Sequence, residues 1–331
     1  MQFSTFNSQL SILIACRNEI NNLPNLLESI ENQTFKPDEV IFIDDNSTDE
    51  TYNFLINYSK KYNYIKVIKN SGKGKKSALI EAAKIATSEY LLFTDADCYL
   101  NNNHCKLAIQ YLNKNNSDML LGAVDITDEK SIFNIIEKIE FSSLQAITAY
   151  TALLNNPIMC NGANLIVKRN IYLLYIDKIN KNIASGDDMF MLHALKKNKA
   201  KINYLYDSNY IIKTKGTNSL KKFIIQRTRW AAKSVNYKDI TTILVALLVA
   251  IINILLLTLL FLNPYTLITI FLIIFVIQNI IMLPYLFKYK QYKILKYYPI
   301  IFPLMSLLYP LYIVTILISI LFYKKTNPHW K

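Results

Sequence analysis

The chain has 331 residues, of which 52% are hydrophobic, and a formal net charge of +13. No Asp or Glu follows Asp239 whereas seven lysines do, so residues 240–331 carry +7 and residues 1–239 carry +6. This composition argues against a wholly soluble protein. The basic charge does not indicate nucleic acid as a partner, because the sequence has no arginine-rich face and no nucleic-acid-binding motif.

The first hundred residues predict alternating strands and helices. Short apolar runs typical of strands occupy 10–15, 39–44, 65–68 and 90–95, with helical patterns at 23–32 and 76–86. This alternation predicts an α/β domain with a mostly parallel sheet, helices on both faces, and ligands at the carboxyl ends of the strands. Three of the runs end in polar clusters, CRNE, DDNSTD and DADC, which we expect to meet at one sheet edge.

The middle of the chain predicts further helices and short strands. A helix is expected over 131–155, a turn into a strand over 160–169, a helix over 185–198 that begins near Ser185, and a strand pair or extended segment over 202–214. The stretch 219–235 is amphipathic and basic, a pattern that suits a helix lying at a membrane surface.

Three long apolar segments follow, at about 240–262, 266–287 and 298–322. Each is close to or above the roughly 20 residues that cross a bilayer. The lysine-rich loop 288–296 is expected in the cytoplasm after two crossings. The third segment contains Pro303 and Pro310, which leaves open a crossing or a kinked, re-entrant course. A full crossing would place the last three lysines on the outer side, against the usual charge bias.

Two polar clusters have the residue types that bind nucleotides. The acids of IDDNSTD (43–49) follow a strand and can accept hydrogen bonds from a base or ribose, although a helix cap is an equally simple reading. The stretch SGKGKKSAL (71–79) could hold phosphate through backbone amides and lysine charge, although its spacing is not that of a Walker A loop and it could be a solvated basic loop.

Asp95 and Asp97 of the TDADC stretch suggest a metal site. Two carboxylates one residue apart repel each other unless water or a cation compensates them, and no basic residue lies beside them in the sequence. With diphosphate oxygens they would make the oxygen-rich site that Mg²⁺ or Mn²⁺ prefers. The alternative is a solvated turn. We expect the counter-charge to be a divalent cation.

Two later motifs offer catalytic groups. Asp187 and Asp188 in SGDD could supply a general base, or merely complement a helix dipole. Arg229 and Trp230 in QRTRW could stabilise a leaving diphosphate and stack on an acceptor, or simply belong to a basic and aromatic membrane interface. The four scattered cysteines lack CxxC spacing and do not indicate zinc or a disulfide framework.

Taken in order, the stretches IACRNE, IDDNSTD, GKKSAL, FTDADC, CNGANLIVKR, SGDD and QRTRW resemble the membrane-associated family-2 glycosyltransferases of the GT-A fold. The resemblance covers roughly residues 9–235. It implies a catalytic GT-A domain at 1–218, an interfacial helix with the QxxRW motif at 219–239, and a transmembrane region at 240–331.

The resemblance also implies a role for each motif position. Nucleotide contacts are implied for Ala15, Arg17, Glu19, Asp44, Asp45, Lys75 and Asp95, and metal ligation for Asp97 with Asp95. Asn161, Gly162 and Asn164 fall in the sugar and acceptor pocket. Asp188 matches the base aspartate, with Asp187 in place of the commoner Glu. Gln226, Arg229 and Trp230 match QxxRW, near the diphosphate and acceptor.

The implied activity is an inverting transfer of a hexosyl or N-acetylhexosaminyl group from a nucleotide-diphosphate donor, most often UDP, with Mg²⁺ or Mn²⁺ as cofactor. The expected acceptor is lipid-linked or membrane-associated, in cell-envelope polysaccharide synthesis. Processive synthases usually have more membrane helices, so we expect one or few transfers. The alternatives are a processive synthase subunit, a nucleotidyltransferase, and a non-catalytic membrane scaffold.

The N-terminal residues bear on the expected cellular location. The first ten residues have no basic stretch followed by an apolar one, so we expect no signal peptide. We therefore expect a multi-pass protein of the inner membrane whose catalytic domain faces the cytoplasm.

Overall fold

The computed structural model describes residues 9–127, 131–176 and 186–323. The chain divides into two compact units. Among the described residues, unit 1 comprises residues 9–125 together with Thr151–Lys215, and unit 2 comprises Ile126–Tyr150 and residues 216–323. Residues 126–150 therefore belong with the C-terminal part, although they lie within the range predicted for the catalytic domain.

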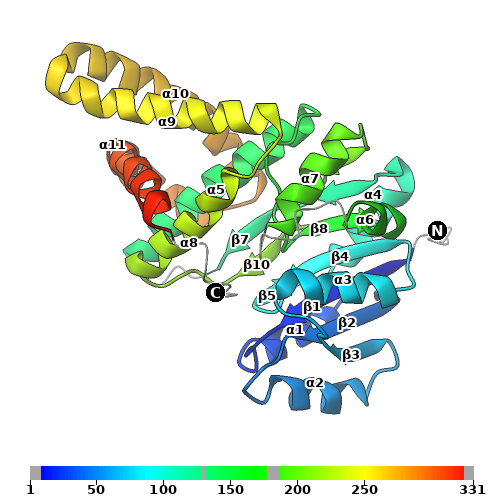
Figure 1. Ribbon diagram of the computed structural model, residues 1–331. Coiled ribbons are helices and arrows are strands. Elements are labelled where there is room, and N and C mark those ends of the chain that lie inside the picture. Colours follow the sequence, from blue (N-terminus) through cyan, green and yellow to red (C-terminus); the bar gives the residue numbers. More distant parts are fainter. Residues whose placement is uncertain (1–8, 128–130, 177–185, 324–331) are drawn as a thin grey trace. The chain divides into compact units, whose positions relative to one another are not determined.

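Unit 1 is built on a seven-stranded mixed sheet in the order β3-β2-β1-β4-β8-β6-β9 (Figure 1). Neighbouring strands are parallel except that β8 runs antiparallel to both β4 and β6. The strands are β1 (Leu10–Cys16), β2 (Glu39–Asp44), β3 (Ile65–Lys69), β4 (Tyr90–Asp95), β6 (Met119–Leu121), β8 (Leu165–Lys168) and β9 (Ile202–Tyr204).

The central strands are apolar and buried along nearly their whole length, as expected for strands covered by helices on both faces. The four strands predicted for the first hundred residues are confirmed. The helices of unit 1 are α1 (Leu23–Glu31), α2 (Thr51–Ser59), α3 (Lys75–Ile85), α4 (His104–Asn115), α6 (Arg169–Ile176) and α7 (Asp187–Lys197). Ser185, the expected start of α7, lies outside the described residues, and Gly186 caps that helix.

The strand register explains why the polar clusters meet. Cys16 of β1 pairs with Asp44 of β2, and Ala15 pairs with Asp95 of β4. The residues that follow these positions therefore leave the sheet at one edge, which is the carboxyl edge of its parallel strands. The predicted convergence is confirmed.

A three-stranded sheet lies beyond this edge, with the order β5-β10-β7. Its strands are β5 (Cys98–Leu100), β7 (Val124–Ile126) and β10 (Ile212–Thr214). The stretch 202–214, predicted as a strand pair or extended segment, forms β9 and β10, which belong to different sheets. Asp95 is thus the last residue of β4, and Asp97 lies in the turn between β4 and β5.

Unit 2 is helical. It contains most of α5 (Ile132–Leu153), then α8 (Leu220–Ser234), α9 (Ile240–Leu262), α10 (Pro264–Lys288) and α11 (Tyr292–Phe322). The last three are long and apolar enough to cross a membrane, with mean hydropathies of 3.1, 2.6 and 2.2. The three predicted apolar segments are therefore confirmed as helices.

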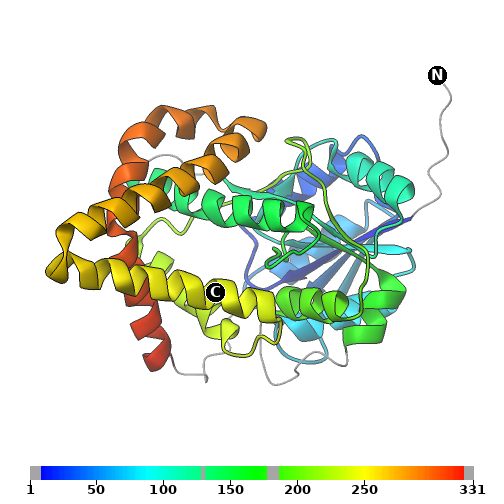
Figure 2. The ribbon, with the colours of Figure 1, turned by 90° about the horizontal axis from the view of Figure 1, so that it is seen from above.

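The turn between α9 and α10 is a single residue. Asn263 ends α9, and its side chain also caps α10 by accepting a hydrogen bond from the amide of Thr266 at 3.1 Å. Pro264 occupies the first position of α10, where a missing N–H costs nothing. The result is a tight helical hairpin, visible in yellow and gold in Figure 2.

Candidate active site

Asp45 is the centre of a hydrogen-bonded cluster that follows β2. Its buried carboxylate accepts hydrogen bonds from the Asn70 amide at 2.5 Å and from the Gly74 backbone N–H at 2.9 Å. Arg17, which follows β1, lies 3.8 Å from the same carboxylate. Three loops of the sheet edge are therefore held together through Asp45.

Asn70 is a member of this cluster that the sequence interpretation missed. It directly follows β3, and its side-chain oxygen accepts hydrogen bonds from the Gly72 N–H and the Ser77 hydroxyl, both at 3.1 Å. The signal was available, because β3 ends at the same edge as the three strands whose polar ends were noted. Asn70 shapes the loop that leads into α3.

Asp44 is buried but only half-satisfied. One carboxylate oxygen accepts a hydrogen bond from the Ser47 amide at 3.2 Å, and the other is buried without a hydrogen-bond partner among the described residues. An unsatisfied buried carboxylate oxygen is costly. A ligand that donates a hydrogen bond, such as a nucleoside, would relieve that cost.

Lys75 reaches from the start of α3 to the acidic cluster. Gly74 before it adopts a positive φ of 87°, a conformation that favours glycine, and Lys75 forms an ion pair with Asp95. Burial alone would lower the pKa of this ammonium group, but the carboxylate of Asp95, with those of Asp187 and Asp188, raises it above its ordinary value. The expectation that Asp95 has no basic partner is therefore wrong: Lys75, 20 positions earlier, provides one.

Asp95, Asp97 and Cys98 form a group whose ligand atoms all lie within 4.8 Å of one another. Burial and the two neighbouring carboxylates raise the pKa of the Cys98 thiol well above its usual value, which disfavours the thiolate form. Two carboxylates beside a neutral thiol suit a hard cation such as Mg²⁺ or Mn²⁺ better than a thiolate-bound zinc. The donor set therefore fits the predicted metal.

Asp188 lies in the first turn of α7 and is oriented by backbone donors. Its carboxylate accepts hydrogen bonds from the Gly162 N–H at 3.0 Å and from the Met189 N–H at 2.8 Å. A Cβ at position 162 would stand 3.2 Å from the same carboxylate oxygen. The NGAN loop thus approaches Asp188 closely because residue 162 is glycine.

Asn164, which the resemblance places in the sugar and acceptor pocket, has a completely buried side chain. Its amide donates to the backbone carbonyls of Ala123 at 2.7 Å and Tyr210 at 3.1 Å. These bonds join the chain after β6 to the segment before β10, and the pocket role of Asn164 stays a prediction. Asn161 is half-exposed and accepts a hydrogen bond from the Ala163 amide.

Ala15 and Glu19, the other predicted nucleotide contacts, are buried in the structure. Ala15 is at the carboxyl end of β1, opposite Asp95. Glu19 accepts a hydrogen bond from the Asn22 side chain at 2.6 Å, just before α1. These contacts support the loop that presents Arg17 and leave the nucleotide role of both residues a prediction.

The QRTRW residues lie on α8 in unit 2. Gln226 accepts a hydrogen bond from the side chain of Arg227, and the Trp230 ring stands 4.4 Å from the Arg227 guanidinium. Arg227 itself is buried against Glu140 of α5, with its Nη2 atom 2.5 Å from a carboxylate oxygen. Arg227 occupies the first variable position of QxxRW, and its guanidinium is the buried charge of this stretch.

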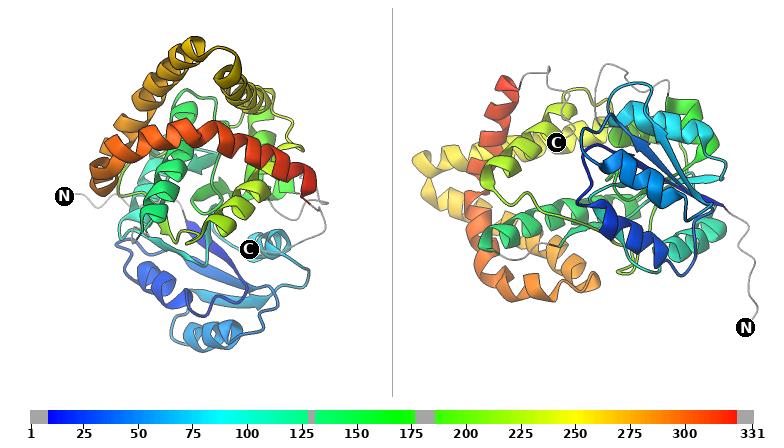
Figure 3. Two further views of the ribbon diagram at one scale, coloured as in Figure 1. Left: turned by 90° about the vertical axis from the view of Figure 1, so that its left-hand side faces the viewer. Right: turned by 90° about the horizontal axis from the view of Figure 1, so that it is seen from below.

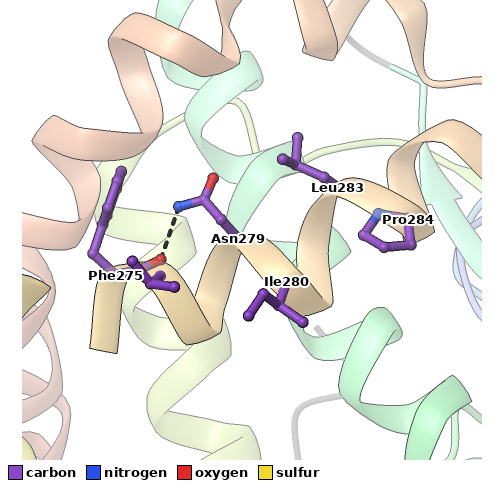
Figure 4. A pocket seen from close by; sticks show the side chains of 6 residues that line it. Phe275, Asn279, Ile280, Leu283 and Pro284 are labelled. Atoms are coloured by element: carbon purple, nitrogen blue, oxygen red, sulfur yellow. Dashed lines mark hydrogen bonds between the residues drawn. The ribbon is translucent and has the colours of Figure 1, made fainter. Parts of the chain in front are cut away.

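An apolar hollow of about 500 Å³ lies on α10 in unit 2 and is shown in Figure 4. The amide of Asn279, its one polar lining side chain, donates to the Phe275 carbonyl of the same helix at 2.8 Å. The hollow contains no ionisable group and offers no chemistry. We therefore place the candidate active site at the acidic edge of unit 1.

Comparison with known proteins agrees with this assignment. Residues 11–172 match the model for glycosyl transferase family 2. A poly(ribitol-phosphate) β-glucosyltransferase of Bacillus spizizenii is 28% identical over 214 residues, 63% of this chain. A poly-β-1,6-N-acetyl-D-glucosamine synthase of Staphylococcus epidermidis is 31% identical over 139 residues, 41% of this chain. The chain spans 33% of the length of each of these relatives.

Solved structures share the fold. Staphylococcus aureus TarS 1–349 in complex with UDP superposes with a TM-score of 0.51 at 23% identity, over 71% of this chain and 67% of that one. A mannosyltransferase from Pyrobaculum calidifontis in complex with GDP-Man and Mn²⁺ gives a TM-score of 0.51 at 17% identity, over 71% and 66%. The predicted GT-A fold is confirmed.

Proposed function

Residues 11–172 form a glycosyl transferase family 2 domain, and on that premise we propose that the chain is an inverting glycosyltransferase. It moves a hexosyl or N-acetylhexosaminyl group from a UDP-sugar to a lipid-linked or membrane-associated acceptor in cell-envelope glycan synthesis. The observation that carries the proposal is the ion pair of Lys75 with Asp95, which lies in one acidic group with Asp97.

The donor nucleotide would bind at the ends of β1 to β4. The unsatisfied oxygen of Asp44 supplies an acceptor for a base or ribose donor group, and Arg17 supplies positive charge beside Asp45. The N-terminus of α3, with Lys75 as its first residue, favours an anionic diphosphate through the helix dipole and the ammonium charge. A solved relative of the same fold holds UDP-GlcNAc, which supports UDP as the nucleotide.

Asp95 and Asp97 would hold the divalent cation, with Lys75 as a permanent neighbouring charge. A bound Mg²⁺ or Mn²⁺ supplies Lewis-acid stabilisation of the departing diphosphate. Lys75 contributes in the same direction, since an ammonium group beside the leaving group stabilises the charge that develops there.

Asp188 is the proposed general base. The Gly162 and Met189 amides fix its carboxylate, which removes the proton of the acceptor hydroxyl. The acceptor oxygen forms its bond to the anomeric carbon as the bond from that carbon to the diphosphate oxygen breaks, and the electron pair leaves with the diphosphate. A single displacement inverts the anomeric configuration.

The acceptor proposal rests on unit 2. Helices α9, α10 and α11 could span a membrane, and the two relatives are named for the synthesis of bacterial cell-envelope glycans. An inner-membrane protein whose catalytic domain faces the cytoplasm would meet both a cytoplasmic nucleotide sugar and a lipid-linked acceptor. We propose transfer of one or few sugars.

A donor panel tests the activity. Purified protein in detergent is given UDP- and GDP-sugars, Mn²⁺ or Mg²⁺ and membrane lipid extract, and release of the nucleotide is measured. We expect turnover with a UDP-sugar, and we expect Asp188→Asn to lower it about 10²- to 10⁴-fold while UDP binding persists. Asp207→Asn, a half-exposed acid elsewhere in unit 1, is the control. Equal turnover by Asp188→Asn and wild type would overturn the base assignment.

A further inference from the structure

Helix α11 differs from α9 and α10 in features that bear on whether it crosses a membrane. Its 31 residues are enough to cross a bilayer by length and composition. Its sequence nevertheless contains three prolines, Pro299, Pro303 and Pro310, and its neighbours in unit 2 include α5 and the basic helix α8. The contacts of its later half decide whether it crosses.

A buried ion pair joins α5 to α8. The Arg227 guanidinium donates from Nε to Glu140 at 3.0 Å and 3.1 Å and from Nη2 at 2.5 Å, and the side chains are only 4% and 6% exposed. The ring of Phe223, one turn earlier on α8, lies 4.5 Å from the guanidinium. The pair is thus an integral part of the α5–α8 interface.

Tyr312 of α11 joins this pair. Its hydroxyl donates to Glu140 Oε1 at 3.1 Å, and its ring packs against that of Phe223 at 5.7 Å between centroids. The depth of Tyr312 in a membrane is therefore the depth of α5 and α8.

Helix α8 is not a helix that hydrocarbon could accommodate. Its 15 residues include five lysines and arginines, of which Lys221 and Lys222 are exposed. The charged residues of α5 are buried within the protein, and α5 is joined to α8 through Glu140. Each charge at the bilayer centre costs at least about 2.5 kcal/mol. The α5–α8 pair must lie at or outside the membrane surface, and Tyr312 must lie there with it.

The remaining length of α11 is then too short for a crossing. Fifteen residues separate Lys296 from Tyr312, and ten follow Tyr312 before the helix ends at Phe322. A perpendicular crossing takes about 20 residues. Neither part reaches this length.

The first part of α11 nevertheless lies beside a membrane helix. Ser306 donates a hydrogen bond to Gln278 of α10 at 3.2 Å, and the rings of Phe302 and Phe275 are 5.7 Å apart. In the left view of Figure 3, α11 bends into an arch, drawn in orange and red. Prolines inside a helix are a known cause of such bending.

Helices α9 and α10 differ from α11 in this respect. From Ile240 to Phe287 there is no charged residue. Their polar side chains donate to the carbonyl four residues earlier, as Asn253, Thr258 and Asn279 do at 2.8–2.9 Å, so little polarity is left exposed to lipid.

We propose that α11 is re-entrant: it enters the membrane beside α10 and returns to the face that carries α8, so that α9 and α10 alone span the bilayer. The lysines agree with this arrangement, because those of the α10–α11 turn and those after Phe322 then share one face with the basic helix α8. The inference rests on the proposed membrane location of the chain.

Single-cysteine labelling tests the proposal. Lys222→Cys on α8, Tyr265→Cys at the α9–α10 turn and Lys325→Cys after α11 are each made in a Cys160→Ser background, since the other native cysteines are buried. Full-length protein in sealed inside-out vesicles is treated with a membrane-impermeant maleimide, before and after permeabilisation.

We expect positions 222 and 325 to react in intact vesicles and position 265 to react only after permeabilisation. Reaction of position 325 in the pattern of position 265 would show a third crossing and overturn the proposal. If all three positions react in intact vesicles and an alkaline wash releases the chain, the membrane location itself fails, and the inference fails with it.

Discussion

Lys75 neutralises an acidic cluster that would otherwise repel itself. It is ion-paired with Asp95 and senses the charges of Asp187 and Asp188, although these acids lie on β4 and α7. Hydrogen bonds to charged groups contribute about 1.5–3 kcal/mol. Lys75 therefore both holds the acidic residues together and supplies positive charge for an anionic ligand.

Replacing Lys75 by methionine should lower kcat/KM for the sugar donor about 10- to 100-fold, because that range corresponds to the loss of one charged hydrogen bond. Steady-state kinetics with varied donor measures the effect. Lys73→Met, an exposed lysine of the same loop, is the matched control and should stay near wild type. Equal losses in the two variants would show that only the general charge of the loop matters.

Glu39 is a second buried acid that forms an ion pair with a lysine, and it lies at the amino end of β2, opposite the candidate active site. Its buried carboxylate accepts hydrogen bonds from the Ser11 hydroxyl, the Lys66 ammonium group and the Thr87 amide, each at 2.6 Å. Burial would raise the pKa of this carboxyl group, but the hydrogen bonds, led by that of Lys66, lower it to about 2 from 4.5. The ionised form is thus favoured in the folded state.

Because the folded pKa of Glu39 is depressed, its stabilising effect is present above pH 4.5 and is lost as the pH falls toward 2. Glu39→Gln should cost on the order of 3 kcal/mol at neutral pH. Thermal unfolding at several pH values should show the gap to wild type closing below pH 4.5. Glu28→Gln, an exposed acid on α1, should show no comparable gap.

The convergence of the acids was predictable, because it follows from strand polarity alone. The partnership of Lys75 with Asp95 was not, because it depends on where α3 starts relative to β4. The hydrogen bonds of Asn164 were not predictable either, because its amide donates to the carbonyls of Ala123 and Tyr210, which are distant from it in the sequence. Only the three-dimensional structure supplies such contacts.

At the scale of elements, the contact between α5 and α8 contains a buried charge pair beside its aromatic contacts. Arg227 and Glu140 are nearly inaccessible, so removal of either leaves the other buried without its counter-charge. Replacing both by apolar groups of similar size removes that penalty. A single replacement should therefore lower the free energy of unfolding more than the double replacement does.

Arg227→Ala should destabilise unit 2 by about 3–5 kcal/mol, whereas Arg227→Met combined with Glu140→Leu should cost clearly less than Arg227→Met alone. The shift of the unfolding midpoint in detergent measures both. Lys222→Ala, an exposed lysine of α8, should change little. Strictly additive losses would contradict the assigned pairing.

Helices and strands with a strong apolar pattern were predictable to within a few residues, including α9 and all four N-terminal strands. Short strands such as β9 and β10 were harder, since a three-residue strand has too little pattern to reveal its sheet. The prolines of α11 predict a kink, but only the structure shows that Tyr312 of this helix contacts Glu140 of α5.

For the whole molecule, the distribution of charge and apolar surface indicates attachment to a bilayer. The hairpin of α9 and α10 exposes large apolar side chains along both helices, among them Leu248, Ile251 and Ile268. Monomeric soluble proteins rarely expose a continuous apolar surface of this extent. This surface needs lipid or detergent.

The full chain should therefore stay in the membrane pellet after an alkaline carbonate wash and enter solution only with detergent. Immunoblotting of pellet and supernatant measures the outcome. A peripheral protein held by basic charge would be released by the same wash or by high salt, and release of most of the chain would contradict integration.

The one-residue turn at Asn263 has a consequence for biogenesis. A hairpin with no polar loop exposes almost nothing hydrophilic at its tip, so little has to be carried across the bilayer when it inserts. The two helices can partition together, as one apolar wedge, once both have been synthesised. In the membrane arrangement proposed above, the lysines at the base of the hairpin would then set its orientation.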